Sequence, residues 1–219
     1  MERILSIREQ VHEELSTTRI VQMVLAGSLD LDLYRRYLVN ARYYAQFSPV
    51  VMALGGSRCV RQHAELGRYL VSHAEEEAGH DRWALQDLAD LGVDEEAALA
   101  AAPVNACRAL VGYVHFLAGD ANPLALFGWM YILEAVGEDL GAIAGRSLVA
   151  QLGEAGTATR FVAGHGEADA EHTPEIAERI ERYIRDASDL HAVADAASVV
   201  KDLYLRMFRE IGGEREQWA

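Results

Sequence analysis

One short stretch decides how the rest of this sequence folds: Phe161-Val162-Ala163-Gly164-His165-Gly166-Glu167-Ala168-Asp169-Ala170-Glu171-His172. In a helix, His165, Asp169 and His172 fall at i, i+4 and i+7, so they share one face. Phe161 and Ile176 extend the same stripe, and we expect this face to point into the core. Two imidazoles and a carboxylate are costly in a core unless something binds them. Such a set suits iron, manganese or zinc; the alternatives are a buried polar network or a solvated helix face.

The composition limits the classes of protein to which the chain can belong. Its 219 residues are 51% hydrophobic with four prolines, which predicts one domain, residues 1–219, with a sizeable core. A formal charge of −14 argues against nucleic acid or an anionic membrane as a partner. Cys59 and Cys107 form no CxxC motif and fit free thiols in a reducing cytoplasm. The charged first residues do not resemble a signal peptide, and no apolar run approaches the ~18 residues of a transmembrane helix.

Apolar residues recur at the helical period through nearly the whole chain. The pattern predicts an all-α, single-domain bundle of about seven to eight helices. The expected helices cover residues 3–26, 30–54, 58–91, 104–119, 123–152, 157–172, 174–186 and 188–211. Gly55 and Gly56 are expected to end the second helix, and Thr173-Pro174 to start the seventh.

The expected helix 58–91 carries polar side chains in its apolar stripe. These are His73, Glu77 and His80. Glu77 and His80 form an ExxH pair, whose i, i+3 spacing can serve one metal ion while the Glu bridges to a second. The motif alone recurs by chance in helical proteins, so its place in the core stripe is what makes it informative. Glu76 lies off the stripe and is expected to be solvated.

The expected helix 123–152 carries one carboxylate, Glu134, on the face that also holds Phe127 and Met130. An isolated buried Glu would raise its pKa and become neutral, whereas a metal ion would keep it ionised. Glycines follow at four-residue spacing, at Gly137, Gly141 and Gly145. They allow a neighbouring helix or a substrate to approach closely.

Three expected helices thus supply three carboxylates and three imidazoles, enough for two metal ions with open positions. The candidate ligands are Glu77, His80, Glu134, His165, Asp169 and His172. Polar residues on the apolar stripe of all three helices are much less probable by chance than on any one of them.

This set resembles the ligands of the haem-oxygenase-like diiron oxidases and oxygenases, which share the fold of haem oxygenase but bind two non-haem irons. Their pattern is a Glu and a His on one helix, a Glu on a later helix, and then H-x3-(D/E)-x2-H. The resemblance implies a first iron bound by Glu77, His80, Glu134 and His165. It implies a second iron that shares a carboxylate and uses Asp169 and His172. Some members have a Glu seven residues before the His; here that position is His73, either a further ligand or a supporting core histidine.

The resemblance also implies an O2-dependent non-haem iron oxidoreductase with two Fe(II) ions, or Mn at one site. Its substrate would be a small amino-acid-like or carboxylate-bearing molecule, oxidised by decarboxylation, carbon–carbon cleavage, desaturation or N-oxygenation. A tyrosine of the protein itself is an alternative substrate. An external electron donor and a homodimer are both compatible with the sequence.

The sequence also predicts where such a substrate would bind. We expect an apolar pocket around Tyr44, Phe127, Met130 and Phe161. Arg206 stands among apolar residues of the last expected helix and is predicted to bind the substrate carboxylate. The alternative is a surface arginine whose stem lies along the protein.

Other functions remain open at this point. A true haem oxygenase needs an axial histidine on the first helix, for which His12 is the candidate. The thiamine-salvage branch of the same fold needs an active-site cysteine, and neither cysteine matches its arrangement. A ferritin-like iron store favours two ExxH motifs, of which we find one. A non-catalytic helical metal-binding or interaction protein would use the polar residues as hydrogen-bond networks, and a single zinc hydrolase site has no use for six ligands.

Overall fold

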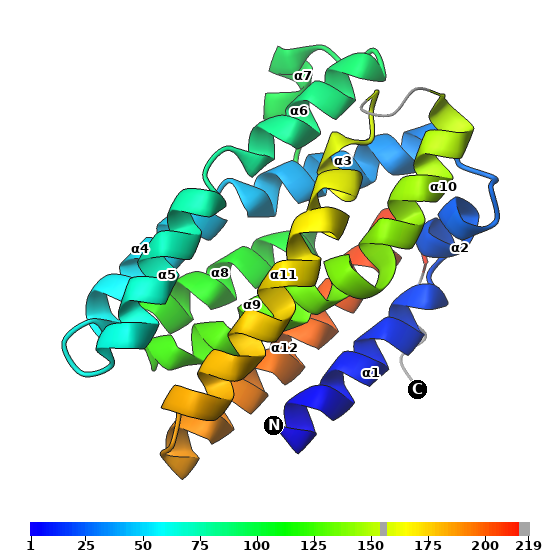
Figure 1. The fold of residues 1–219 in the computed structure, drawn as a ribbon. Helices are drawn as coiled ribbons and strands as arrows, with labels where there is room; N and C mark the ends of the chain where they lie inside the picture. The colour runs from blue at the N-terminus through cyan, green and yellow to red at the C-terminus, as the bar shows by residue number, and fades with distance from the viewer. Residues whose placement is uncertain (154–156, 215–219) are drawn as a thin grey trace.

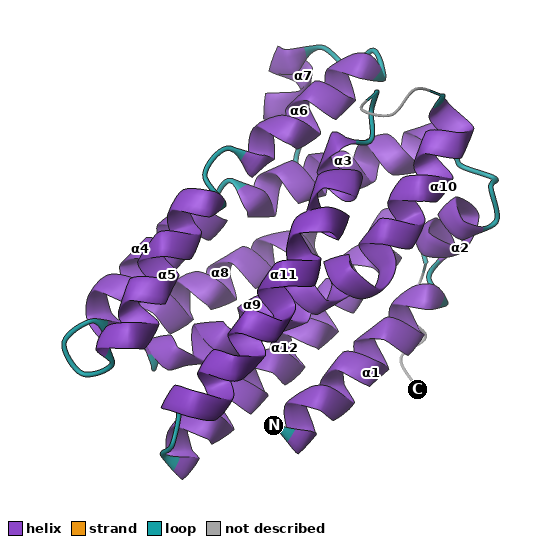
Figure 2. Cartoon of the chain, in the orientation of Figure 1, coloured by secondary structure: helices purple, strands orange, loops and turns teal. Residues whose placement is uncertain are grey.

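The computed structural model describes residues 1–153 and 157–214, which form helices joined by short loops with no strand among them (Figure 2). The α-helices are α1 (Glu2–Ser16), α2 (Arg19–Leu25), α3 (Leu31–Ala45), α4 (Ser48–Cys59), α5 (Ala64–Glu76), α6 (His80–Asp90), α7 (Glu95–Ala100), α8 (Asn105–Gly119), α9 (Leu126–Val136), α10 (Ala142–Leu152), α11 (Arg160–Tyr183) and α12 (Ala187–Gly212). A 3₁₀ turn, η1 (Pro123–Ala125), precedes α9, and a π-helical turn, η2 (Gly137–Gly141), follows it. The predicted all-α class is therefore confirmed.

Helix α9 lies in the middle of the bundle, beside α11 and α12 (Figure 1). Nearly all its residues are buried, which explains why it reads as continuously apolar. Two groups of buried side chains surround the site. One joins α1, α8, α9 and α12, and the other joins α3, α6 and the first half of α11. Tyr37 and Tyr44 of α3 pack against both groups, so α3 borders the space between them.

The predicted break at Gly55 and Gly56 is wrong, because both glycines lie inside α4. They permit close packing instead. A Cβ at Gly55 would clash with the side chain of Leu126, and one at Gly56 would lie 2.9 Å from the carbonyl oxygen of Gly67. Tertiary contacts thus override the local tendency of paired glycines to end a helix.

The predicted continuous helix 58–91 is also wrong. The chain turns between α4 and α5, and again between α5 and α6, where Gly79 takes a left-handed φ of 100°. Only glycine adopts that conformation without strain. Glu77 caps the end of α5 and His80 begins α6. The ExxH pair therefore spans a turn rather than one helical face.

The predicted helix boundary at Thr173-Pro174 is also wrong, because α11 continues through both residues without a break. Pro174 has no N–H to donate to the carbonyl of Ala170. The hydroxyl of Thr173 donates to the carbonyl of Asp169 at 2.9 Å. Ile176 is fully buried, so the packing of the apolar stripe keeps the helix continuous.

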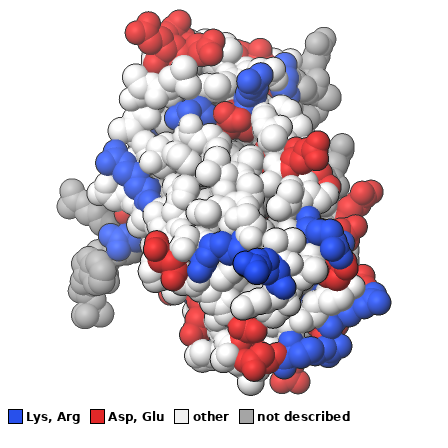
Figure 3. Space-filling view, turned by 90° about the vertical axis from the view of Figure 1, so that its left-hand side faces the viewer, with Lys and Arg blue, Asp and Glu red and all other residues white. Residues whose placement is uncertain are grey.

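The surface carries both signs of charge. On the face shown in Figure 3, Lys and Arg side chains alternate with Asp and Glu around uncharged areas, so the acidic excess is not gathered on this face. Within the described residues, no helix is both long and apolar enough to cross a membrane.

Candidate metal centre and its pocket

Two neighbouring groups of candidate ligands lie where α5, α6, α9 and α11 meet. The first consists of His73, Glu134 and His172, and the second of Glu77, His80 and His165. In each group one ligand atom per residue lies within 4.8 Å of the others. Each group supplies two imidazoles and one carboxylate, the set that binds iron in non-haem Fe(II) oxygenases.

In the first group the carboxylate of Glu134 contacts both imidazoles. Its Oε1 lies 3.0 Å from Nε2 of His73, and its Oε2 lies 3.2 Å from Nδ1 of His172. Burial alone would raise the pKa of Glu134, but the hydrogen bonds from His172 and His73 outweigh burial and hold that pKa well below its usual range. The hydrogen bond to Glu134 raises the pKa of His172 in turn.

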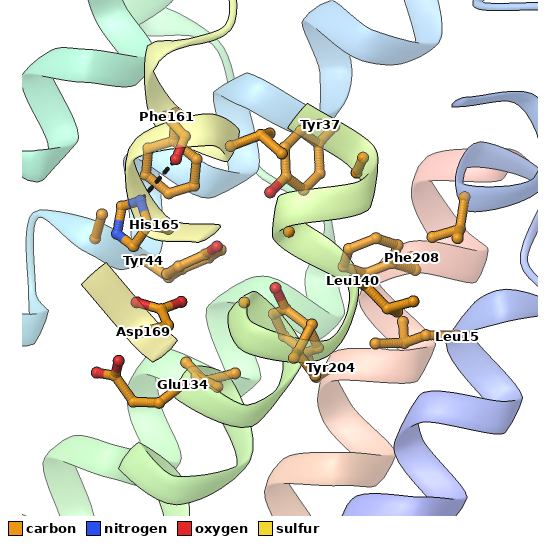
Figure 4. Close-up of a pocket in the computed structure, with 18 of the residues that line it drawn as sticks. Leu15, Tyr37, Tyr44, Glu134, Leu140, Phe161, His165, Asp169, Tyr204 and Phe208 are labelled. Carbon is orange, nitrogen blue, oxygen red and sulfur yellow. Dashed lines mark hydrogen bonds between the residues drawn. The ribbon is translucent and has the colours of Figure 1, made fainter. Parts of the chain in front are cut away.

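In the second group the backbone fixes one imidazole. Nδ1 of His165 lies 2.7 Å from the carbonyl oxygen of Phe161, one turn earlier on α11 (Figure 4). A carbonyl oxygen only accepts, so Nδ1 carries the hydrogen and Nε2 of the neutral ring keeps a free lone pair. Burial lowers the pKa of His165, which favours the neutral ring. This arrangement orients histidine ligands at metal centres.

Asp169 lies between the groups, its carboxylate next to that of Glu134 (Figure 4). Burial, the charge of Glu134 and a hydrogen bond to Glu134 all raise the pKa of Asp169, and the charge of Glu77 adds to the effect. The raised pKa favours the protonated carboxyl of Asp169, the form that can donate to Glu134. With a cation between them, both would ionise and act as ligands.

The donor atoms fit metal ions better than they fit a self-contained hydrogen-bond network. Nδ1 of His73 and Nδ1 of His80 are both buried without a hydrogen bond. Glu76 Oε2 lies 3.4 Å from Nδ1 of His73, and Glu77 Oε1 lies 3.1 Å from Nδ1 of His80. Neither contact has the angles of a hydrogen bond. Buried polar atoms without partners are rare and costly. Reorientation of these rings around bound ions would remove that cost.

The N-terminus of α11 is held by a residue that the sequence analysis missed. Asp87 is fully buried, and its carboxylate accepts hydrogen bonds from the backbone N–H groups of Arg160 and Phe161 at 3.0 and 2.8 Å. These contacts fix the start of the helix that carries His165 and Asp169. A usable signal was present, since Asp87 follows Ala84 by three residues on the apolar stripe of α6.

The π-helical turn η2 lets α9 and α11 approach at the site. A Cβ at Gly137 would overlap the carboxylate of Asp169, lying 2.6 Å from its Cγ. From the other side, Arg8 of α1 holds η2: its guanidinium lies 2.9 Å from both Glu138 Oε2 and Asp139 Oδ2. π-Helical turns are frequent at functional sites.

The structure brings the six predicted ligands together with His73. It groups them differently from the sequence prediction, which assigned Glu134 to the iron of Glu77, His80 and His165. Here Glu134 instead contacts His73 and His172. Glu76, expected to be solvated, is half-exposed, but its Oε2 lies 3.4 Å from His73 and 3.6 Å from His172. Which of these residues bind metal remains a prediction.

A cavity of about 140 Å³ adjoins these groups. Tyr44, Met130 and Phe161 line it, as expected. Phe127 does not; its ring instead stacks with that of Tyr69 at 6.1 Å.

The prediction that Arg206 faces this pocket is wrong. Its side chain is 45% exposed and its Nε lies 2.9 Å from Glu210 Oε1. Asp202 and Glu210 stand four residues before and after Arg206 on the outer face of α12. Opposite charges at this spacing indicate an exposed helix face, and the sequence analysis overlooked this signal.

Comparison with known proteins identifies the family. Residues 35–205 match the family of iron-containing redox enzymes. The chain belongs to this family. An iron-containing redox enzyme is therefore its broad functional class, and the predicted resemblance is confirmed at the level of family and fold. No curated protein sequence matches the chain.

Several solved structures share the fold of this chain. A domain of unknown function with a haem oxygenase-like fold from Shewanella denitrificans has a TM-score of 0.85 at 23% identity, and the match covers 94% of this chain and 89% of that one. A TenA homologue from Pseudomonas syringae has a TM-score of 0.78 at 14% identity, covering 96% and 91%. A cyanobacterial haem oxygenase from Synechocystis, in complex with haem, has a TM-score of 0.66 at 19% identity, covering 97% and 93%.

The residues required by the two alternative enzymes of this fold do not line the pocket. His12 of α1 has a 43% exposed side chain and lies 3.9 Å from Asp139 on the outer surface. Cys59 and Cys107 are buried outside the pocket lining, and burial raises their pKa values to about 11 and about 12. Thiols with raised pKa values are poor nucleophiles.

Proposed function

We propose that this iron-containing redox enzyme family member is a non-haem diiron oxidase or oxygenase that uses O2 to oxidise a small organic substrate. The observation that supports this most directly is the pair of adjoining groups of two histidines and one glutamate. Mixed imidazole and carboxylate ligands with open positions are typical of iron sites that react with O2. The cavity beside them offers space for a substrate.

The residues have distinct roles in this proposal. His73, Glu134 and His172 would hold one iron, and Glu77, His80 and His165 the other, with Asp169 placed to contribute to either. The two ferrous ions would supply the electrons for the reduction of O2. The chain itself orients His165 through the carbonyl of Phe161, and it places apolar side chains of the pocket beside the centre.

The predicted amino-acid-like or carboxylate-bearing substrate finds no Lys or Arg among the lining residues that the structure describes. A substrate carboxylate would therefore have to contact the metal ions themselves. The predicted use of manganese at one site and of an external electron donor belongs to the same proposal.

Metal content after anaerobic Fe(II) loading and desalting tests the proposal. We expect about two irons per wild-type chain and far less in His165→Ala. His191→Ala is the matched control, because His191 is 69% exposed and pairs with Asp195 far from the site. This control should load as the wild type does.

Iron-loaded protein should then consume O2 when a substrate is added. Equal iron retention by wild type and His165→Ala, or no retention after titration with excess Fe(II), would contradict the proposal. Competition between Fe(II) and Mn(II) during loading would determine the metal preference.

A further inference from the structure

The pocket beside the candidate metal centre is mainly apolar. Glu134, His165 and Asp169 line it, and so do apolar residues of α2 and α10 such as Val21, Leu25 and Leu148. Its volume of about 140 Å³ is close to that of an engineered apolar cavity that binds benzene. The pocket thus has room for a hydrocarbon group of at least that size.

Three phenols meet in the middle of the pocket. The hydroxyls of Tyr37, Tyr44 and Tyr204 point toward one another (Figure 4). The three phenols lie close enough for each to affect the pKa of another. Burial raises the pKa of Tyr204 to about 12 and those of Tyr37 and Tyr44 well above their usual value. All three phenols are therefore neutral at physiological pH.

This chain of hydroxyls retains one hydrogen that can be donated. Each phenol has one hydrogen, and a row of three hydroxyls uses at most two of these hydrogens for bonds within the row. The third can be donated to an acceptor inside the pocket. Buried tyrosine hydroxyls normally find such a partner, and apart from the acidic side chains at the candidate metal centre the described walls of the pocket are mainly apolar.

The part of the pocket away from the candidate metal ligands favours a neutral ligand. The acidic side chains of the lining, Glu77, Glu134 and Asp169, are all candidate metal ligands, and none of the other lining residues that the structure describes is Asp, Glu, Lys or Arg. Along the apolar part an anionic or zwitterionic group would lose its hydration without gaining a partner. A neutral oxygen loses much less and gains the hydrogen bond from the phenols.

We propose that the pocket binds an uncharged, mainly hydrocarbon molecule with one hydrogen-bond-accepting oxygen, a ketone, ether or alcohol, at the hydroxyls of Tyr37, Tyr44 and Tyr204. That this ligand is the substrate rests on the proposed function. Its binding does not, because the phenols and the apolar walls are supplied by the chain itself.

Matched probes of one chain length test the inference: 2-heptanone, heptane, heptanoate and heptylamine. Binding to iron-loaded and metal-free full-length protein is measured by displacement of an apolar fluorescent dye, with metal content determined on the same samples. We expect 2-heptanone to bind most tightly to both forms. Tyr204→Phe should weaken 2-heptanone about fivefold and leave heptane unchanged.

Two further variants serve as controls. Tyr43→Phe alters a neighbouring phenol of α3 that packs on Phe47 and does not line the pocket, so it should bind all probes as wild type does. Ala144→Phe fills the pocket and should abolish binding of 2-heptanone and heptane while iron loading persists.

Three results would overturn the inference. They are tighter binding of heptanoate than of 2-heptanone to the iron-loaded protein, equal losses of heptane and 2-heptanone in Tyr204→Phe, and no binding of any probe to either form. Failure to load iron with intact 2-heptanone binding would instead refute the proposed diiron function alone.

Discussion

Gly137→Ala tests whether the close approach of η2 and α11 shapes the candidate metal centre. A methyl group at Gly137 would overlap the carboxylate of Asp169, with its carbon 2.6 Å from Cγ and 3.0 Å from Cβ. Ordinary carbon contacts are about 3.5–4.0 Å, so the Asp169 side chain must move by about 1 Å. That movement breaks its hydrogen bond to Glu134.

The expected free-energy change is the sum of two opposing effects. Replacing glycine by alanine in a helix stabilises by about 1 kcal/mol, whereas overpacking a filled core costs about 1–3 kcal/mol. We therefore expect Gly137→Ala to destabilise the metal-free protein by about 1 kcal/mol. Gly112→Ala is the matched control, because no atom lies within 4 Å of a Cβ there. It should be stabilised by about 1 kcal/mol.

Chemical denaturation of both metal-free variants measures this difference, and Fe(II) titration measures its effect on the site. Displacement of Asp169 should lower iron affinity about 10- to 100-fold, while Gly112→Ala should bind as wild type. If Gly137→Ala is stabilised like the control and binds iron normally, Asp169 does not contribute to the centre as we reason.

Three further predictions concern the supports of the site. Arg8→Met should destabilise the protein by about 1 kcal/mol and weaken iron binding, because the side chain no longer holds η2. Calorimetric titration with Fe(II) measures the binding. A titration that matches wild type would show that Arg8 does not position this turn. Asp87→Asn should cost about 2 kcal/mol in a denaturant titration, since one carboxylate acceptor of the buried N–H groups becomes a donor; wild-type stability would contradict this. Apparent iron affinity should rise with pH from neutral values upward, because metal binding releases protons from its ligands and the pKa values of Asp169 and His172 are both raised. An affinity independent of pH would refute this assignment.

Much of the candidate site could be predicted because its spacing is local. His165, Asp169 and His172 share a face through helical geometry alone, and α11 keeps them in one helix. The identity of the remaining candidate ligands followed from polar residues on apolar stripes. Their grouping did not, because the contact of Glu134 with His73 and His172 depends on how α5, α9 and α11 cross.

Errors arose where one local rule had two outcomes. Paired glycines end a helix or permit close packing, and only the contact of α4 with Leu126 selects the second. An arginine among apolar neighbours faces a pocket or the solvent, and Arg206 follows the exposed stripe of α12.

The sequence by itself therefore determined the helical class, the core-facing stripes and the polar residues that interrupt them, because side-chain periodicity is a property of each helix alone. Only the tertiary structure decided the pairing of the ligands, the position of Asp169 against Gly137, and the meeting of Tyr37, Tyr44 and Tyr204 in one apolar pocket. These depend on interhelical distances and on the π-helical turn, which arise when separate helices pack together.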